Sequence, residues 1–344
     1  MKTRRIKILA VAALMILTAV FTMACSKTEP SVPETTAEPV TEPVEVPAPV
    51  ETSDAETAPA PAVTIDEFLQ KNNISEILKT HSNVHMITEW DSGSDSSSFV
   101  ADCVYFQTDK GILKVESVSF PAKDRGNTRL VTQYGDDPYT VFLVMDPDGT
   151  RTVTLSPAEN VENDTVMSLV DGTAELTANM TVLNIADQAQ TEEGTRLTVM
   201  GKDPDNGEEM YEASYTVDPD TLVAIRGESN VYMGDEWMGT RKITVTLDDG
   251  SVSAPEDPCL LEGDETAYNI TLQIRHADGT EEVQTYKVAE GSMLEYEDFR
   301  IFTVYDDPEM KKEHAGNPEL DTGISTFICQ VKEDRTVYVL QSED

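Results

Sequence analysis

Residues 211–222 read YEASYTVDPDTL, and this stretch decides the fold class. Polar residues alternate with the apolar residues Tyr211, Ala213, Tyr215 and Val217. A period of two is typical of a β-strand with one buried and one solvated face. The strand pattern stops at residues 218–221, DPDT, and Asp and Pro favour tight turns. The stretch therefore predicts a strand, a turn and a returning antiparallel strand.

The same pattern recurs on both sides of this stretch. Turn residues at 108–111, 146–149 and 203–207 each separate two runs of β-branched or aromatic residues, and polar residues alternate with Ile243, Val245 and Leu247. We therefore expect roughly ten strands between residues 84 and 247, arranged as an antiparallel meander. Residues 157–178 break the pattern and predict a helical or irregular interval that covers the open face of the sheet.

Two short helices are predicted before the first strand. Thr64 with Glu67, and Asn73 with Glu76, have the spacing of helix N-terminal capping signals. Apolar residues at helical spacing follow each signal: Phe68, Leu69, Ile74, Ile77 and Leu78. The expected fold is mainly β, formally α+β, with short helices, a curved antiparallel meander or half-barrel, and then a smaller β domain.

The helix, the long meander and the hairpin around residues 215–222 resemble the half-open β-barrel of LolA-type lipoprotein carriers and related bacterial lipoproteins. The resemblance covers residues 64–250. It implies a curved sheet around a hydrophobic cavity that helices close, and some members of the family bind acyl chains there. The sequence leaves open whether such a cavity is empty or filled by Tyr, Leu and Met side chains.

A second β domain is predicted after an acidic, Pro-bearing link at residues 251–265. Residues 269–275 alternate cleanly and turn at 277–280, which predicts another hairpin. The order of hairpin, Gly291-Ser292-Met293-Leu294, aromatic strand and final strand resembles the β-grasp-like repeats of the internalin B-repeat type, over residues 266–341. That resemblance implies a spacer or interaction module. The link has no amphipathic period, so we expect few contacts to cross it.

The N-terminus predicts export and a lipid anchor. A basic head precedes an apolar run that ends at Ala24-Cys25, and polar residues follow at once. This order resembles bacterial lipoprotein signals, which implies a leader at residues 1–24 and palmitate on Cys25. Thr22 stands where such signals usually have Leu. A transmembrane anchor or an ordinary cleaved signal is the alternative.

Residues 25–63 predict a solvated tether. They contain no aromatic residue and eight of the 18 prolines, with Glu or Asp between them. The chain has a formal net charge of -39, and the leader holds four of the 25 basic residues and no acid, which leaves 21 against 64. Such a field excludes nucleic acid as a partner, because that binding depends on Lys and Arg.

No catalytic or cofactor motif is present, and we expect neither a cofactor nor a metal. His81 and His85 lie near each other, and we interpret them as solvated helix-end residues. An acidic turn could hold calcium, although a turn rich in Asp is more often only a turn; it contains Asp203, Asp205, Glu208 and Glu209. We expect the remaining cysteines to be core residues, with at most one disulfide among them: Cys103, Cys259 and Cys329.

Trp90 and Trp237 are interpreted as a lid on the barrel mouth, with a sugar or lipid platform as the alternative. Together these patterns predict a lipid-anchored, non-enzymatic protein at the cell surface. Its ligand would be a lipid or another apolar molecule held in the half-barrel. The alternatives are a structural or adhesive protein that binds a protein partner through its C-terminal β domain and, more remotely, an undetected hydrolase.

Overall fold

The computed structural model describes residues 62–95, 97–122, 125–135, 138–158, 182–202, 207, 209–233, 236–264, 266–298, 300–316, 320–323 and 325–342. The chain divides into two compact units, Met1–Val63 and Thr64–Asp344. The description that follows concerns the second unit.

Two short helices open this unit. The side chain of Thr64 accepts a hydrogen bond from Glu67 N at the start of α2 (Ile65–Lys71), and Asn73 caps α3 (Ile74–Ile77) through Glu76 N. Both predicted capping signals are therefore confirmed. The two helices bury Phe68, Ile74 and Ile77, because these positions share the faces that point toward the sheet.

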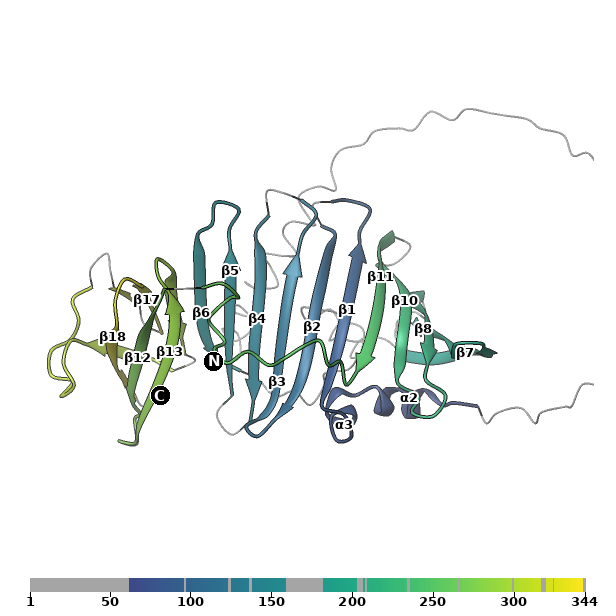
Figure 1. The fold of residues 1–344 in the computed structure, drawn as a ribbon, viewed down its shortest axis with the longest axis horizontal. Helices are drawn as coiled ribbons and strands as arrows, with labels where there is room; N and C mark the ends of the chain where they lie inside the picture. Colours follow the sequence, from purple (N-terminus) through teal and green to yellow (C-terminus); the bar gives the residue numbers. More distant parts are fainter. Residues whose placement is uncertain are drawn as a thin grey trace, which may run out of the picture. The chain divides into compact units, whose positions relative to one another are not determined.

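A large sheet of 14 strands, drawn in Figure 1, contains most of the unit. Its order from one edge to the other is β16-β17-β14-β6-β5-β4-β3-β2-β1-β11-β10-β9-β8-β7. The strands are β1 (Asn83–Asp91), β2 (Phe99–Thr108), β3 (Gly111–Ser119), β4 (Asn127–Tyr134), β5 (Tyr139–Met145), β6 (Arg151–Pro157), β7 (Val182–Thr191), β8 (Gly194–Lys202), β9 (Glu209–Val217), β10 (Ala224–Met233), β11 (Glu236–Leu247), β14 (Met293–Glu297), β16 (Leu320–Thr322) and β17 (Thr326–Gln330).

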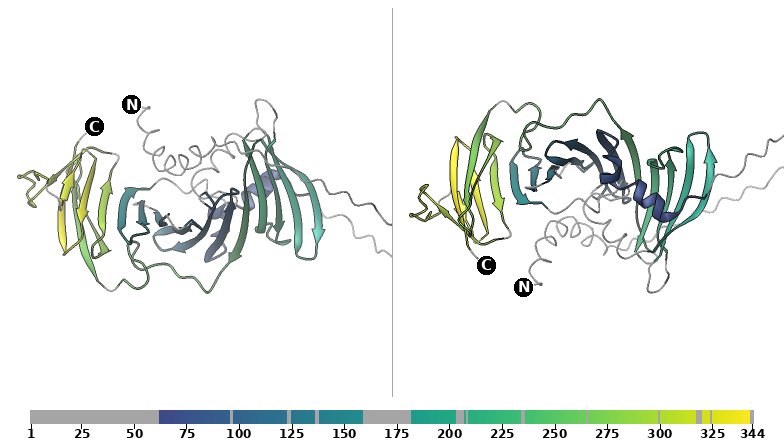
Figure 2. Two further views of the ribbon diagram at one scale, coloured as in Figure 1. Left: turned by 90° about the horizontal axis from the view of Figure 1, so that it is seen from above. Right: turned by 90° about the horizontal axis from the view of Figure 1, so that it is seen from below.

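The two faces of the large sheet have different neighbours. Figure 2 shows that the sheet is curved. The face that carries Tyr215 is called the helix face, because the Tyr215 ring lies 5.4 Å from that of Phe68 in α2. The opposite face carries Val104, Val131 and Leu155 and is called the sandwich face. Strand side chains alternate between these two faces.

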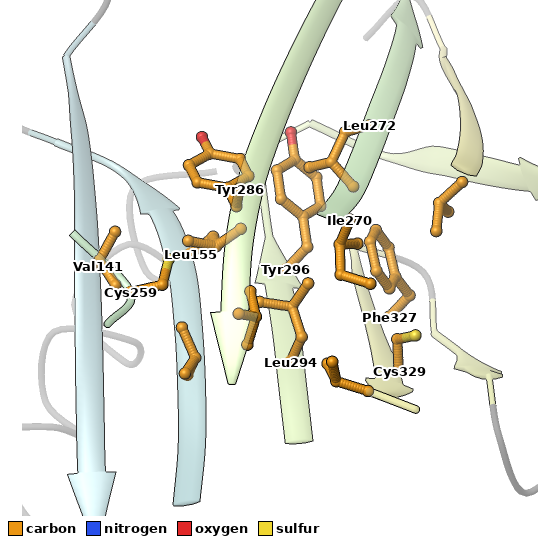
Figure 3. Close-up of a cluster of buried hydrophobic side chains, with 14 of the residues drawn as sticks. Val141, Leu155, Cys259, Ile270, Leu272, Tyr286, Leu294, Tyr296, Phe327 and Cys329 are labelled. Carbon is orange, nitrogen blue, oxygen red and sulfur yellow. The ribbon is translucent and has the colours of Figure 1, made fainter. Parts of the chain in front are cut away.

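A second sheet packs on the sandwich face. It has four strands in the order β13-β12-β18-β15, namely β12 (Ala267–Arg275), β13 (Glu281–Ala289), β15 (Phe302–Tyr305) and β18 (Arg335–Gln341). Figure 3 shows the cluster of buried side chains that the two sheets share; it includes Val141, Leu155, Ile270, Leu272, Tyr296 and Phe327. At roughly 25 cal/mol per Å² of apolar surface, this burial is a main stabilising contribution to both sheets.

The C-terminal segment contributes strands to both sheets. β14 pairs in parallel with β6, and Leu294 is the partner of Val153. Strands β14, β16 and β17 therefore extend the large sheet, whereas β12, β13, β15 and β18 form the second one. The prediction that few contacts connect the C-terminal part with the part before residue 251 is therefore wrong. The sequence could not reveal the connection, because a parallel strand pair between distant segments leaves no trace in the local pattern of either one.

The predicted link also packs against the sheets. Cys259 is 1% exposed and belongs to the shared core, with Val252 and Leu261 partly buried beside it. Arg129 Nη1 donates to Leu260 O at 2.5 Å, and an ion pair of 2.6 Å joins Arg151 to Asp264. These contacts hold the C-terminal part of the link, at Leu260 and Asp264, against β4 and β6.

Most of the predicted local structure is confirmed. The mainly β fold class holds, and the hairpins at residues 108–111, 146–149 and 218–221 connect β2 to β3, β5 to β6 and β9 to β10. β12 and β13 form the hairpin expected in the C-terminal part. The predicted interval at residues 157–178 lies almost wholly outside the described residues. No helix in the described part of the chain is long and apolar enough to cross a membrane.

Candidate functional site

The helix face carries a continuous apolar surface from β8 to β2. Strand pairing places Tyr215, Gly227, Ile243, Thr88 and Ala101 in one row across β9, β10, β11, β1 and β2. Neighbouring rows contribute further buried apolar side chains, namely Val84, Met86, Cys103, Tyr105, Leu197, Val199, Ala213, Val217 and Val245. This set is called the apolar face below.

Two aromatic rings lie flat on this face over glycines of the adjacent strand. A Cβ added at Gly227 would lie 2.5 Å from the Tyr215 ring, and one added at Gly239 would lie 2.3 Å from the Trp90 ring. Any larger residue at either position would push the ring off the sheet. The sequence spacing gave no signal for either relationship, because each joins residues on different strands.

Polar side chains are buried within or beside the apolar face. Arg241 is 2% exposed and is the cross-strand partner of Trp90, while Thr88 and Ser229 are 1% and 2% exposed. Farther along, Lys114 and Glu116 of β3 form an ion pair of 3.1 Å. Buried ionic groups need partners, so these positions are the polar ends of an otherwise apolar surface. Sequence reasoning singled out none of them.

An aromatic rim lies at the end of the sheet farthest from α2 and α3. It is formed by Trp90, Phe99, Phe120 and Trp237. The rings of Trp90 and Phe99 stack at 6.5 Å, and Phe99 meets Phe120 edge-on at 6.3 Å. The guanidinium of Arg125 lies 4.1 Å from the Phe120 ring centre. The rim therefore runs across the ends of β11, β1, β2 and β3.

Trp237 is the exposed member of the rim. It lies in β11 opposite Tyr232, after a register shift in the β10–β11 hairpin. It is 43% exposed. A Cβ added at Gly93 would lie 3.4 Å from its ring, so the ring lies next to the loop after β1. Trp90 lies near the end of β1.

A groove of about 590 Å³ lies on the sandwich face of β8–β11. Most of its lining residues carry hydroxyl groups or charges of both signs, including Arg196, Arg226, Lys242, Glu212 and Glu228. Arg226 also pairs with Glu193 at 3.0 Å. The groove is open, and its lining is suited to a polar ligand better than to a lipid chain.

The two histidines that were interpreted as solvated helix-end residues have carboxylate partners. His81 Nδ1 lies 2.7 Å from Asp248, and His85, which belongs to β1, lies 2.7 Å from Asp249 and 3.0 Å from Asp102. The hydrogen bonds from His81 and Ser82 lower the pKa of Asp248 to about 2, and those from His85 and Ser251 lower the pKa of Asp249 to about 2. These pairs hold the turn at which the chain leaves β11.

The remaining predicted site residues are the cysteines and the acidic turn. Cys103, Cys259 and Cys329 are buried free thiols, as expected of core residues. The acidic turn considered for calcium, with Asp203, Asp205 and Glu208, lies outside the described residues, as does Cys25. Within the described ranges, no three His, Cys, Asp or Glu side chains gather in a group that could hold a metal ion.

Comparisons with known proteins found no matching family model and no matching curated protein. Solved structures with a similar arrangement include the lipoprotein LppX of Mycobacterium tuberculosis, with 12% identity, a TM-score of 0.29, and coverage of 56% of this chain and 100% of LppX. A LolA superfamily protein of Nitrosomonas europaea has 10% identity, a TM-score of 0.25, and coverage of 57% and 96%. The MucA/MucB complex of Pseudomonas aeruginosa has 10% identity, a TM-score of 0.30, and coverage of 76% of this chain and 91% of the matched chain. Because these TM-scores are low, no property of these proteins is transferred to this chain. Its fold is described from its own strand pairing.

Proposed function

We propose that this protein is a lipid-anchored, extracytoplasmic, non-enzymatic binding protein that holds an acyl chain or similar apolar ligand against the apolar face. The observation that carries the proposal is the width of that face. Buried apolar side chains continue across six adjacent strands, from β8 to β2. Helix α2 meets this face through Phe68, whose ring lies 5.4 Å from that of Tyr215. A surface of this kind binds ligands through apolar area rather than through directed hydrogen bonds.

Several side chains along the middle of the apolar face are small. Ala101, Cys103, Ala213 and Ser229 come from β2, β9 and β10 and are small beside their neighbours Tyr105 and Leu197. A chain of methylene groups laid over small residues gains about 0.8 kcal/mol for each methylene that leaves water. Several buried methylenes therefore provide affinity without any specific contact.

Arg241 supports an acidic ligand. Its guanidinium is buried at the edge of the apolar face, where strand pairing sets it beside Trp90 and Ser229. The positive charge of this guanidinium would attract a carboxylate or phosphate headgroup, and the low dielectric of a buried site strengthens that attraction. The acyl chain would then extend away from Arg241 over Ile243 and Met86.

The test combines native mass spectrometry of the purified full chain with titration of a fluorescent fatty acid. Bound lipid, or saturable probe binding that Ala213→Phe weakens at least tenfold, is expected. Val283→Ala, which alters an exposed residue of the second sheet, serves as the control. Absence of lipid and of probe binding in a folded protein would mean that the face is a filled core, and would favour the structural or adhesive role.

A further inference from the structure

The two tryptophans and two glycines of the aromatic rim are arranged reciprocally. Trp90 of β1 lies over Gly239 of β11, while Trp237 of β11 contacts Gly93 in the loop that follows β1. Each strand thus supplies a ring to the other strand's glycine. A side chain at Gly239 would displace the Trp90 ring, and one at Gly93 would strain the backbone, because Gly93 has a φ of +76°. The two glycines thus keep the β10–β11 hairpin next to the loop after β1.

The described residues of the loop beside Trp237, 92–95 and 97–98, carry several hydroxyl groups that are hydrogen-bonded within the loop. Ser92 Oγ lies 2.6 Å from Ser97 Oγ, and the Ser98 hydroxyl donates to Ser94 O at 2.8 Å. Asp91 Oδ1 accepts the Gly93 N–H at 2.8 Å. Asp91 is exposed, so its carboxylate can also accept hydrogen bonds from a ligand.

We propose that Trp237, Asp91 and the described residues of the following loop, 92–95 and 97–98, form a binding site for neutral saccharides, with one pyranose ring stacked on the indole. The face of an aromatic ring carries partial negative charge and attracts the polarised C–H groups of a sugar. Asp91 accepts hydrogen bonds from sugar hydroxyls, and the serine hydroxyls both donate and accept them. The exposed indole face can pack against the C–H groups of a pyranose, while the neighbouring polar groups bind its hydroxyl groups.

The charge around the site selects among ligand classes. Asp91, Asp95 and Glu236 are exposed and lie within a few residues of Trp90 or Trp237 in the chain. Arg125 lies against the Phe120 ring at the other end of the rim, and the chain carries a net charge of -39. Anionic glycans and anionic membranes are repelled by such a field. A neutral lipid surface would have to dehydrate these carboxylates without supplying hydrogen bonds in return. A neutral saccharide supplies hydroxyl donors to the same groups.

The site would act independently of the apolar face. Trp237 is near the start of β11, and Figure 1 shows that this end of β11 is opposite to α2 and α3. Trp237 is exposed, whereas the side chains of the apolar face are buried. Loss of acyl-chain binding therefore should not alter saccharide binding. The converse also holds, because no residue of the saccharide site belongs to the apolar face.

The experiment titrates the full chain with two neutral probes, a β-1,4 glucose tetramer and a β-1,4 N-acetylglucosamine tetramer, and follows tryptophan emission and heat. Saturable binding of at least one probe is expected, with at least tenfold weakening in Trp237→Ala and in Asp91→Asn. Trp237→Phe should retain part of the affinity. Val283→Ala should bind like the wild type, and circular dichroism verifies that each variant is folded.

Failure of both probes to bind, or equal binding by wild type and Trp237→Ala, would overturn the proposal. A blue shift of Trp237 emission with neutral phosphatidylcholine vesicles, without any response to the saccharides, would also overturn it and would assign the rim to a lipid surface. Removing Trp237 in a Trp237→Phe variant shows which of the two tryptophans reports in each case.

Discussion

Leu294 in β14 and Val153 in β6 are direct partners in a parallel pair of strands. Both side chains are fully buried in the core that the two sheets share. The pair joins the C-terminal region to the large sheet by backbone hydrogen bonds as well as by side-chain packing. Unfolding of one region therefore exposes apolar surface of the other, and we expect the unit Thr64–Asp344 to melt cooperatively.

A truncated chain comprising residues 64–253 should be less stable than residues 64–344. The truncation exposes Val141, Leu143, Val153 and Leu155 on the sandwich face and removes the strand that pairs with β6. Thermal melting followed by circular dichroism should show a midpoint lowered by about 5 °C or more, given that about 1 kcal/mol shifts Tm by about 2–4 °C in a chain of this size. A midpoint equal to that of the longer chain would restore the picture of two independent domains.

Ile270→Ala should destabilise both sheets together. Ile270 lies in β12, is fully buried and belongs to the shared core. Loss of its side chain is expected to lower the free energy of unfolding by about 2–5 kcal/mol. The control Val283→Ala, at a position 64% exposed, should change it by less than about 0.5 kcal/mol. Separate transitions for the two sheets in chemical denaturation would contradict a common core.

Gly239→Val should displace Trp90. The added side chain would begin 2.3 Å from the indole ring, and overpacking of this kind usually lowers stability by about 1–3 kcal/mol. Gly250→Ala is the matched control, because a Cβ at Gly250 has no atom within 4 Å. A second variant that combines Gly239→Val with Trp90→Ala should recover part of the loss. Equal stabilities of Gly239→Val and Gly250→Ala would refute the close contact.

The histidine–carboxylate pairs predict a loss of stability in strong acid. Asp248 and Asp249 have pKa values lowered to about 2, so their hydrogen bonds stabilise the fold above the unfolded value near 3.8. This contribution is lost as the pH falls from about 4 to about 2, because protonation then occurs in the folded state. Asp248→Asn and Asp249→Asn should therefore flatten the dependence of Tm on pH in this window, whereas Glu290→Gln should not.

Lipidation at Cys25 can be tested in growing cells. Labelled palmitate should enter the wild-type chain and be absent from Cys25→Ser, because the thiol is the proposed site of attachment. The variant should also move from the membrane fraction to the medium or the soluble extract. Equal labelling of both chains would exclude Cys25 as the modified residue.

Local features of this fold could be predicted from the sequence because their causes are local. The alternation around Tyr215, the turn at Asp218 and the caps at Thr64 and Asn73 each depend on residues a few positions apart. The mainly β class followed from them. The apolar face was also expected, although only as one side of each strand.

The pairing of distant segments could not be predicted in the same way. Nothing in the sequence near Leu294 indicates Val153 as its neighbour, and Cys259 lies in a stretch that reads as a polar link. The contacts of Trp90 with Gly239 and of Trp237 with Gly93 depend on strand register and on one irregularity in the β10–β11 hairpin. A buried Arg241 likewise looks like any strand arginine until the register places it on the apolar face.

The three buried thiols have a consequence for how the molecule can be observed. Burial raises the pKa of Cys259 to about 12, so the reactive thiolate is scarce there at neutral pH. Cys103, Cys259 and Cys329 lie in β2, in the link segment and in β17; all three are buried and none forms a disulfide. Each sulfur reacts with a thiol reagent only while its own neighbourhood is open. The rate at which each thiol is labelled therefore reports how often its own region opens. The three rates refer to the middle of the large sheet, the link segment and the C-terminal edge.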